Sequence, residues 1–177
     1  MSNPVLAGGL VCPVPSQASD RVLLGHGSGG KMSQHLLRDR FLPHFDNPIL
    51  AELGDGAVLG DGPRSTVVTT DSFVVSPLEF PGGNIGSLAV HGTLNDLAMM
   101  GAAPVCLTAA FILEEGLSFE LLDRVAAAMG LAARDAGVPI VTGDTKVVER
   151  GKADGMYINT TGIGQRLERV RPGPERA

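Results

Sequence analysis

The chain has 177 residues and a mass of 18.3 kDa, which suits one domain with tails and leaves little room for two full domains. Hydrophobic residues make up 44% and charged residues 19%, an ordinary globular composition that excludes wholesale disorder. The net charge is −5 and Lys and Arg form no run, so no nucleic-acid partner is expected. No apolar stretch approaches the ~18 residues of a membrane span, so no membrane partner is expected either.

The two cysteines, Cys12 and Cys106, lie far apart in the sequence and form no CxxC pair. This spacing argues against a zinc site and against a disulfide framework, and it favours a reducing compartment. The N-terminus carries neither a basic region nor a sustained apolar segment, so we do not expect a signal peptide. Together these features predict a cytoplasmic protein.

The N-terminal part is expected to contain a tail, a glycine-rich loop and one helix. Residues 1–20 mix Pro, Ser, Gly and Ala without periodicity, which is typical of a flexible tail. A short apolar run leads into GHGSGGK at positions 25–31. Apolar residues then recur at helical spacing over 32–41. We expect this helix to end before Pro43, because the residue before a proline disfavours the helical conformation.

The rest of the chain alternates strand-like and helix-like segments. We expect strands over 57–59, 66–75, 104–113, 138–144 and 156–164, and helices over 84–100 and from Ser118, a plausible N-cap, to about Ala136 before Gly137. The charged, proline-rich segment 166–177 is expected to begin a linker. Strands alternating with helices predict an α/β or α+β domain with a mixed sheet.

The segment GHGSGGK fits two nucleotide-binding patterns at once, G-x-G-x-x-G and G-x-x-x-x-G-K. Both patterns place backbone N–H groups and a helix N-terminus next to a phosphate. Neither match is clean. A Walker loop needs Ser or Thr after the lysine, where Met32 stands in this sequence. A dinucleotide-binding unit needs an acid at the end of its second strand, and Glu52, about 20 residues on, could supply it. From this segment alone, a flexible glycine turn without a ligand is an equally good interpretation.

Four aspartates beside small residues form a stronger signal. Asp55 lies in LGDGA, Asp71 in TTDSF, Asp96 in NDLA and Asp144 in TGDTK, which also carries Lys146. Hard cations such as Mg²⁺ bind oxygen ligands together with nucleotide phosphates, and a neighbouring glycine lets the backbone approach closely. Taken singly, Asp-Gly is a common turn and Asp96 could be a satisfied buried acid. Four such settings together favour a shared site.

The histidines and cysteines are weaker candidates. His26, inside the glycine loop, could contact a phosphate or a substrate. His91 lies among small residues on an expected helix, where we favour packing in the core. Cys106 lies in an apolar run and is expected to be buried, and Cys12 has no evident basic partner that would activate its thiol.

Taken in order, these segments resemble the N-terminal half of the HypE family of hydrogenase maturation factors. The likeness rests on LLGHGSGGKM, LGDGAVL, TTDSFVVSPLEFPGGNIGSLAVHGTLNDLAMMGA and GVPIVTGDTKVV, and covers about residues 21–165. HypE belongs to the superfamily of aminoimidazole ribonucleotide synthetase, selenophosphate synthetase and thiamine-monophosphate kinase. The resemblance therefore implies an aminoimidazole ribonucleotide synthetase-like N-terminal domain that dimerises through its sheet and binds ATP without a Walker or Rossmann fold.

The resemblance also implies a chemistry and a set of partners. A HypF-like carbamoyltransferase places a carbamoyl group on a C-terminal cysteine of HypE. HypE then uses ATP and Mg²⁺ to dehydrate this S-carbamoyl group to a thiocyanate. The cyanide passes to the iron of a [NiFe] hydrogenase on a HypC–HypD scaffold. On this reading the parent protein is an ATP-dependent carbamoyl dehydratase that forms a homodimer.

The resemblance assigns roles to particular residues of this sequence. It implies that Lys146 and His26 are catalytic, with Lys146 neutralising phosphoryl charge as it develops. The phosphate-binding residues are implied to be Gly27, Ser28, Gly29, Asp71, Asn95, Asp96 and Asp144, and the metal ligands Asp55, Asp71, Asp96 and Asp144.

Two departures from the family shape the expected organisation. HypE proteins carry a second domain and a C-terminal acceptor cysteine, whereas this sequence stops at Ala177. We expect an ATP-binding N-terminal domain at 21–165, followed by the start of a linker at 166–177 with the C-terminal domain absent, and no turnover by this chain alone. The alternatives are another ATP-using enzyme of the superfamily, such as a small-molecule kinase or synthetase, and a non-catalytic dimerisation or docking module. A Rossmann oxidoreductase is a more distant alternative, and Ser28 counts against a selenophosphate synthetase.

Overall fold

The structure is a computed structural model that describes residues 21–45, 47–60, 62 and 64–168. The chain divides into two compact units, Met1–Asp46 and Asn47–Ala177, each of which is described by itself. The expected tail at 1–20 lies outside the described residues, as does most of the expected linker at 166–177.

The first unit is helical over its described part. A 3-10 turn, η1 (Leu24–Gly27), precedes α1 (Lys31–Leu36), a π-helical stretch η2 (Leu37–Phe41) and α2 (Leu42–Phe45). The prediction that the helix ends before Pro43 is wrong, because α2 contains that residue. The helical backbone runs without a break from α1 through η2 into α2, because Leu36 and Leu42 are both in the right-handed helical conformation. Pro43 therefore lies directly after a π-helical stretch, where the regular backbone hydrogen bonding that a proline interrupts is already altered.

The second unit is built around a five-stranded sheet. After a 3-10 turn, η3 (Leu50–Glu52), its strands are β1 (Ala57–Leu59), β2 (Thr66–Phe73), β5 (Ala102–Glu114), β6 (Ile140–Val148) and β7 (Met156–Arg166). Their order across the sheet is β1-β2-β7-β5-β6. Only the β5–β6 pair is parallel, so the expected mixed sheet is confirmed. A separate two-stranded pair, β3 (Glu79–Phe80) with β4 (Gly83–Asn84), was not predicted.

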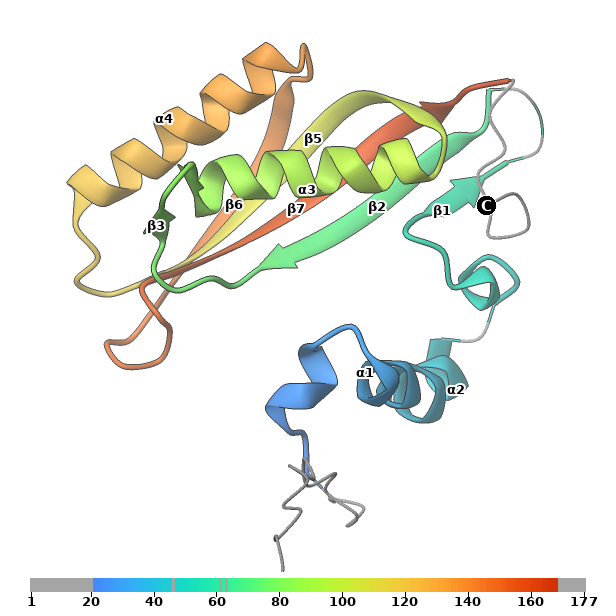
Figure 1. The fold of residues 1–177 in the computed structure, drawn as a ribbon, viewed down its shortest axis with the longest axis horizontal. Helices are drawn as coiled ribbons and strands as arrows, with labels where there is room; N and C mark the ends of the chain where they lie inside the picture. Colours follow the sequence, from blue (N-terminus) through green and yellow to red (C-terminus); the bar gives the residue numbers. More distant parts are fainter. Residues whose placement is uncertain (1–20, 46, 61, 63, 169–177) are drawn as a thin grey trace, which may run out of the picture. The chain divides into compact units, whose positions relative to one another are not determined.

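Two helices, α3 (Ile85–Met99) and α4 (Phe119–Asp135), lie over the same face of this sheet (Figure 1). Strand β2 alternates accordingly: Val67, Thr69 and Phe73 are buried, whereas Thr66, Thr70 and Ser72 are exposed. The main core between helices and sheet comprises Phe73, Ile85, Ala89, Val90, Leu107, Ala109, Val125, Met129, Ala132, Ala133, Val138, Met156 and Ile158. The other face of the sheet carries no helix of the described second unit.

Local capping explains why both helices begin where the sequence predicts. The Asn84 side chain accepts hydrogen bonds from the backbone N–H groups of Gly86 and Ser87, and the Ser87 hydroxyl closes a capping box. The Ser118 hydroxyl accepts from the N–H of Leu121 at the start of α4. Beyond α4, Gly137 has a φ of +68°, a conformation that favours glycine after a helix. None of the described helices is long and apolar enough to cross a membrane.

Glycines allow α3 to pack very closely on its neighbours. A Cβ atom at Gly86 would lie 2.4 Å from the backbone oxygen of Val125 in α4. A Cβ atom at Gly162 of β7 would lie 2.8 Å from the methyl group of Thr93 in α3. In the same contact of α3 with the sheet, the buried hydroxyls of Thr93 and Thr160 are hydrogen-bonded to each other. Glycines therefore determine how closely α3 approaches α4 and how closely it approaches the sheet.

We expect Gly86→Ala to destabilise the fold by about 2 kcal/mol or more, because the new methyl group meets a backbone atom that cannot move without shifting α4. Gly130→Ala is the matched control: this glycine is also helical, and its Cβ would meet only the flexible end of Arg134. The control is expected to be neutral or stabilising by up to about 1 kcal/mol. Urea unfolding followed by circular dichroism measures both. Equal stability of the two variants would contradict this account of the α3–α4 contact.

Candidate functional site

Three of the predicted aspartates come together at one end of α3. Asp55 lies in the loop before β1, Asp71 lies on β2 and Asp96 lies on α3. The hydroxyl of Thr69 links two of them: its Oγ1 is 2.7 Å from the backbone oxygen of Asp55 and 3.0 Å from Oδ2 of Asp96. A loop, a strand and a helix thus contribute to one acidic cluster, which we define as Asp55, Asp71 and Asp96.

Asp71 faces α3 across a gap that a glycine leaves open. It follows Thr69 by two residues, so both side chains lie on the helix-covered face of the sheet. A Cβ atom at Gly92 would lie 3.6 Å from Oδ2 of Asp71 and 2.8 Å from the ring of Phe73. Because Gly92 is one helical turn before Asp96, the two carboxyl groups occupy neighbouring places beside the helix.

The electrostatics of Asp96 reflect this crowding. Burial raises the pKa of its carboxyl group above the ordinary value, and the negative charges of Asp71 and Asp55 raise it further. The hydrogen bond from Thr69 acts in the opposite direction and lowers the pKa. The net rise in pKa means that ionising this carboxyl is less favourable here than for a freely exposed aspartate.

A magnesium ion at the acidic cluster would need ligands besides the carboxylates of the protein. Among the described residues, no group of three or more His, Cys, Asp or Glu side chains is arranged to hold a metal ion by itself. Mg²⁺ usually retains several waters and binds through one or two carboxylates together with substrate phosphates. Repelling carboxylates that are half-buried or exposed beside open solvent have the chemistry that such an ion requires.

Asp144 and Lys146 lie elsewhere in the same chain. They form an exposed ion pair on β6, with 2.6 Å between Lys146 Nζ and Asp144 Oδ2, and the Lys146 ammonium lowers the pKa of that carboxyl. The strand register aligns Asp71 with Thr160, Ala109 and Gly143. Asp144 is therefore three strands away from Asp71, roughly 14 Å, and points to the opposite face of the sheet. One copy of the chain does not bring all four aspartates together.

The predicted residues of the glycine loop belong to the first compact unit. There Ser28 donates its hydroxyl to the backbone oxygen of Gly25, and the N–H of Gly29 donates to Oγ of Ser33. His26 Nδ1 accepts from the N–H of Leu23 at 2.8 Å, and a Cβ at Gly27 would have no atom within 4 Å. In the second unit, Asn95 is an exposed neighbour of Asp96.

Two predictions about single residues have an outcome in the structure. His91 is exposed, so the preference for core packing is wrong. The buried side of α3 runs through Ala89, Val90, Thr93 and Leu97, and His91 falls outside it. Cys106 is a free thiol of intermediate burial, so the expectation that it is buried is wrong. Sequence reasoning missed Thr69, and its only signal was a hydroxyl residue two positions before Asp71 in a strand.

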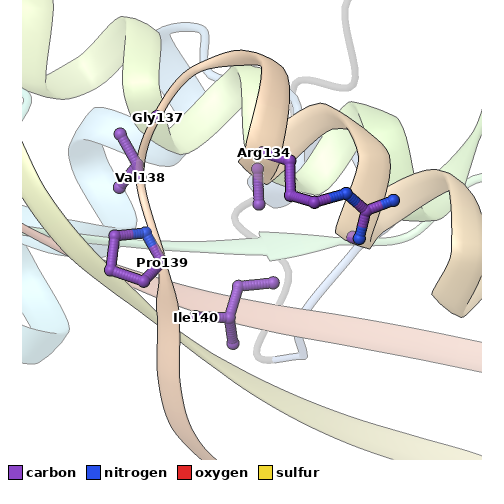
Figure 2. Close-up of a pocket in the computed structure, with 7 residues that line it drawn as sticks. Arg134, Gly137, Val138, Pro139 and Ile140 are labelled. Atoms are coloured by element: carbon purple, nitrogen blue, oxygen red, sulfur yellow. The ribbon is translucent and has the colours of Figure 1, made fainter.

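Two hollows lie away from the acidic cluster. One, of about 410 Å³, lies where α4 gives way to β6, with Arg134 on the helix and Pro139 and Ile140 on the following segment (Figure 2). Its other lining residues are small or apolar, and none is a predicted site residue. The other, of about 560 Å³, lies along β6 and includes Asp144 in its wall.

Comparison with known families identifies the fold. Residues 53–165 match the family described as "AIR synthase related protein, N-terminal domain". The chain belongs to this family. Its matched segment contains the whole acidic cluster together with Asp144 and Lys146.

Curated relatives refine this placement. The chain is 52% identical over 163 residues to a carbamoyl dehydratase HypE of Rhizobium leguminosarum bv. viciae, covering 88% of this chain and 47% of the relative. It is 50% identical over 151 residues to the carbamoyl dehydratase HypE of Escherichia coli K12, covering 82% and 45%. The resemblance to the N-terminal half of HypE is confirmed. The chain spans less than half the length of these relatives.

Solved structures agree. The chain is similar to one in a crystal structure of a HypE–HypF complex, with 51% identity, a TM-score of 0.70, and coverage of 74% of this chain and 42% of the other. It is similar to HypE in complex with ATP, with 59% identity, a TM-score of 0.58, and coverage of 83% and 44%. A likeness to a ThiL chain at 15% identity, with a TM-score of 0.61 and coverage of 83% and 45%, concerns the fold alone.

The raised pKa of Asp96 predicts how stability depends on pH. The folded pKa exceeds the unfolded one, so charging this carboxyl opposes folding, and stability is lost as the pH rises through this window. We expect Asp96→Asn to raise the melting temperature at pH 7 by roughly one or two degrees, since partial exposure screens the charge. The gain should shrink as the pH falls toward about 3.9, the ordinary pKa of aspartate.

Calorimetric melting scans across this pH range measure the effect. Asp123→Asn, at an exposed position of α4, is the matched control and should show no such pH-dependent gain. A destabilised Asp96→Asn at pH 7 would contradict the charge repulsion inferred for the cluster.

Proposed function

We propose that this chain is the N-terminal, ATP-binding part of a HypE-type carbamoyl dehydratase. The observation that carries the proposal is the acidic cluster, in which Asp55, Asp71 and Asp96 converge from three elements beside the Thr69 hydroxyl. The cluster lies inside a segment about half identical to curated carbamoyl dehydratases, and a similar HypE was solved in complex with ATP. The parent reaction would dehydrate a C-terminal S-carbamoyl-cysteine to a thiocyanate, the source of the cyanide ligands of [NiFe] hydrogenase.

In this proposal the acidic cluster holds Mg²⁺–ATP by its phosphates. Bound Mg²⁺ supplies positive charge that balances the carboxylates and the phosphate oxygens. Asp71 and Asp96 bind the ion from the strand and from the helix, and Asp55 binds it from the loop. Asn95, next to Asp96, is the neutral phosphate-binding group. Because phosphoryl transfer depends mainly on positioning and charge, this preformed arrangement is the chain's main contribution.

Lys146 is proposed as the catalytic cation, with Asp144 holding its ammonium group in place. The pair lies on β6, on the face of the sheet that carries no helix of the described second unit, so it does not meet the acidic cluster of its own copy. A homodimer formed through the sheet would give Asp144 and Lys146 of one copy a route to the nucleotide of the other. Phosphate contacts of Gly27, Ser28 and Gly29, and a catalytic role of His26, stay predictions from the resemblance.

The domain limits and partners follow from the same proposal. Residues 21–165 form the ATP-binding domain, and 166–177 lead toward the second domain that completes the enzyme. The similarity to HypE in a HypE–HypF complex supports a HypF-like carbamoyltransferase as a partner. A HypC–HypD scaffold would receive the product. Turnover is proposed for the complete parent and not for this chain alone.

Two other functions fit the same fold. A small-molecule kinase or synthetase of the superfamily would also bind Mg²⁺–ATP, and the 15% identity to ThiL bears on fold and not on substrate. A non-catalytic dimerisation or docking module would bind HypF without nucleotide. High identity to carbamoyl dehydratases favours the first proposal over both.

Calorimetric titration of the chain with ATP, with and without Mg²⁺, tests the proposal. We expect Mg²⁺-dependent binding, and Asp71→Asn should weaken it by about tenfold or more, because a carboxylate facing the ion is lost. Glu115→Gln, at an exposed position near the end of β5, is the control and should bind as the unaltered chain does. A folded chain that binds a HypF-like protein but no nucleotide would favour the docking module. Full affinity of Asp71→Asn would remove Asp71 from the metal site.

The exposed edge strand β6 supports the proposal that the chain forms a homodimer. It is the nine-residue edge strand of the sheet, and it exposes 58% of Val141 and 67% of Val147. Long exposed edges with apolar side chains are prone to pair with another strand. We expect light scattering at micromolar concentration to give twice the chain mass of 18.3 kDa. Val147→Lys should shift this mass toward the monomer, whereas Leu131→Lys on α4 should not. A monomeric unaltered chain would refute the dimer.

A further inference from the structure

The buried hydroxyl of Thr69 joins two of the three acids of the acidic cluster. It is 4% exposed, and its oxygen contacts both the backbone oxygen of Asp55 at 2.7 Å and Oδ2 of Asp96 at 3.0 Å. One buried side chain on β2 therefore touches the loop before β1 and the carboxyl group of an α3 residue. These two segments are 41 positions apart in the sequence between Asp55 and Asp96.

The contact with Asp55 begins where strand pairing ends. The β1–β2 ladder starts at Ala57, which aligns with Val68, so Asp55 and Gly56 precede the ladder. On β2, Thr69 is the first residue beyond this last pair. Its hydroxyl donates a hydrogen bond to the backbone oxygen of Asp55, where no backbone pairing joins the loop to β2. The side chain thus extends the attachment of the loop to β2 beyond the last paired residue.

A glycine allows the loop to come this close. A Cβ atom at Gly56 would lie 2.9 Å from the backbone oxygen of Val68 and 3.4 Å from Cβ of Thr69. It would also lie 3.2 Å from Cγ of Met100, just after α3. The loop is therefore packed between β2 and the end of α3. The hydrogen bond of Thr69 then determines where along this contact Asp55 lies.

The hydroxyl has a single proton for two acceptors. It donates to the Asp55 carbonyl or to the Asp96 carboxylate, and both oxygens stay within hydrogen-bond distance of Oγ1. A buried acceptor that loses its donor is destabilised by more than an ordinary hydrogen bond contributes. Removing the hydroxyl would therefore remove both contacts at once, whereas removing only the methyl group would keep both.

We propose that Thr69 is a positioning residue that ties the Asp55 loop to Asp96, so that the two acids present their carboxyl groups to the same phosphate-bound cation. This inference rests on the proposed function, because it concerns the same Mg²⁺–ATP site. It assigns a role to a neutral residue outside the acidic cluster. Thr69 itself touches neither the ion nor the nucleotide and acts through Asp55 and Asp96.

The test compares Thr69→Val, which keeps the shape and loses the hydroxyl, with Thr69→Ser, which keeps the hydroxyl and loses the methyl group. Thr93→Val is the matched control, because Thr93 is equally buried and its hydroxyl binds Thr160 instead of the acids. Two measurements are made on each variant: Mg²⁺–ATP affinity by calorimetry, and amide hydrogen exchange of residues 54–57 by nuclear magnetic resonance.

We expect Thr69→Val to weaken Mg²⁺–ATP binding by about tenfold, the scale of a lost hydrogen bond to a charged group, and to speed exchange at 54–57 by about tenfold. Thr69→Ser should restore both values to within about twofold, and Thr93→Val should leave both unchanged even where it lowers the melting temperature. An unaffected Thr69→Val would overturn the proposal, and so would a Thr69→Ser as weak as the valine variant.

The two proposals can fail separately. If the unaltered chain binds no Mg²⁺–ATP, the proposed nucleotide site of this chain is contradicted, but exchange at 54–57 still decides whether Thr69 holds the loop. If the unaltered chain binds and only the Thr69 predictions fail, the nucleotide site stands and the positioning role does not.

Discussion

The close approach of α3 to the sheet is the constraint on which the rest of the second unit depends. Gly92 and Gly162 remove the side chains that would otherwise hold the helix away from β2 and β7. With the helix this near, Asp96 on α3 and Asp71 on β2 lie beside each other, and the Thr69 hydroxyl can reach both Asp55 and Asp96. The same closeness brings like charges together, which raises the pKa of Asp96. The charge repulsion that opposes folding at this point is the same feature that would favour a cation in the proposed site.

Local signals in the sequence predicted the elements well. Asn84 and Ser118 are N-caps, and the two helices that they begin were placed within a residue or two of their observed starts. Pro43 misled because the helical backbone continues through it, after a π-helical stretch, instead of ending before it. The short pair β3–β4 was missed because two residues per strand are too few to show a period of two.

The arrangement of the site was less predictable. Glycine-flanked acids pointed to a shared cation site, and the structure brings Asp55, Asp71 and Asp96 together. The place of Asp144 depends on strand order and register, which are non-local and leave no trace within TGDTK itself. A buried threonine in a strand is also ordinary in sequence, so Thr69 could be recognised only once its two acceptors were in place.

The order of strands has a consequence for how the chain folds as it is made. Strand β7 comes last along the chain among the five strands of this sheet, yet it lies in the middle and joins β2 on one side to β5 on the other. Before Met156 leaves the ribosome, the five-stranded sheet exists only as two separate strand pairs, β1–β2 and β5–β6, with nothing between them. Both pairs then expose edges that later belong to the interior. A stalled or prematurely ended translation product would therefore be a target for chaperones and proteases, because the central strand arrives last.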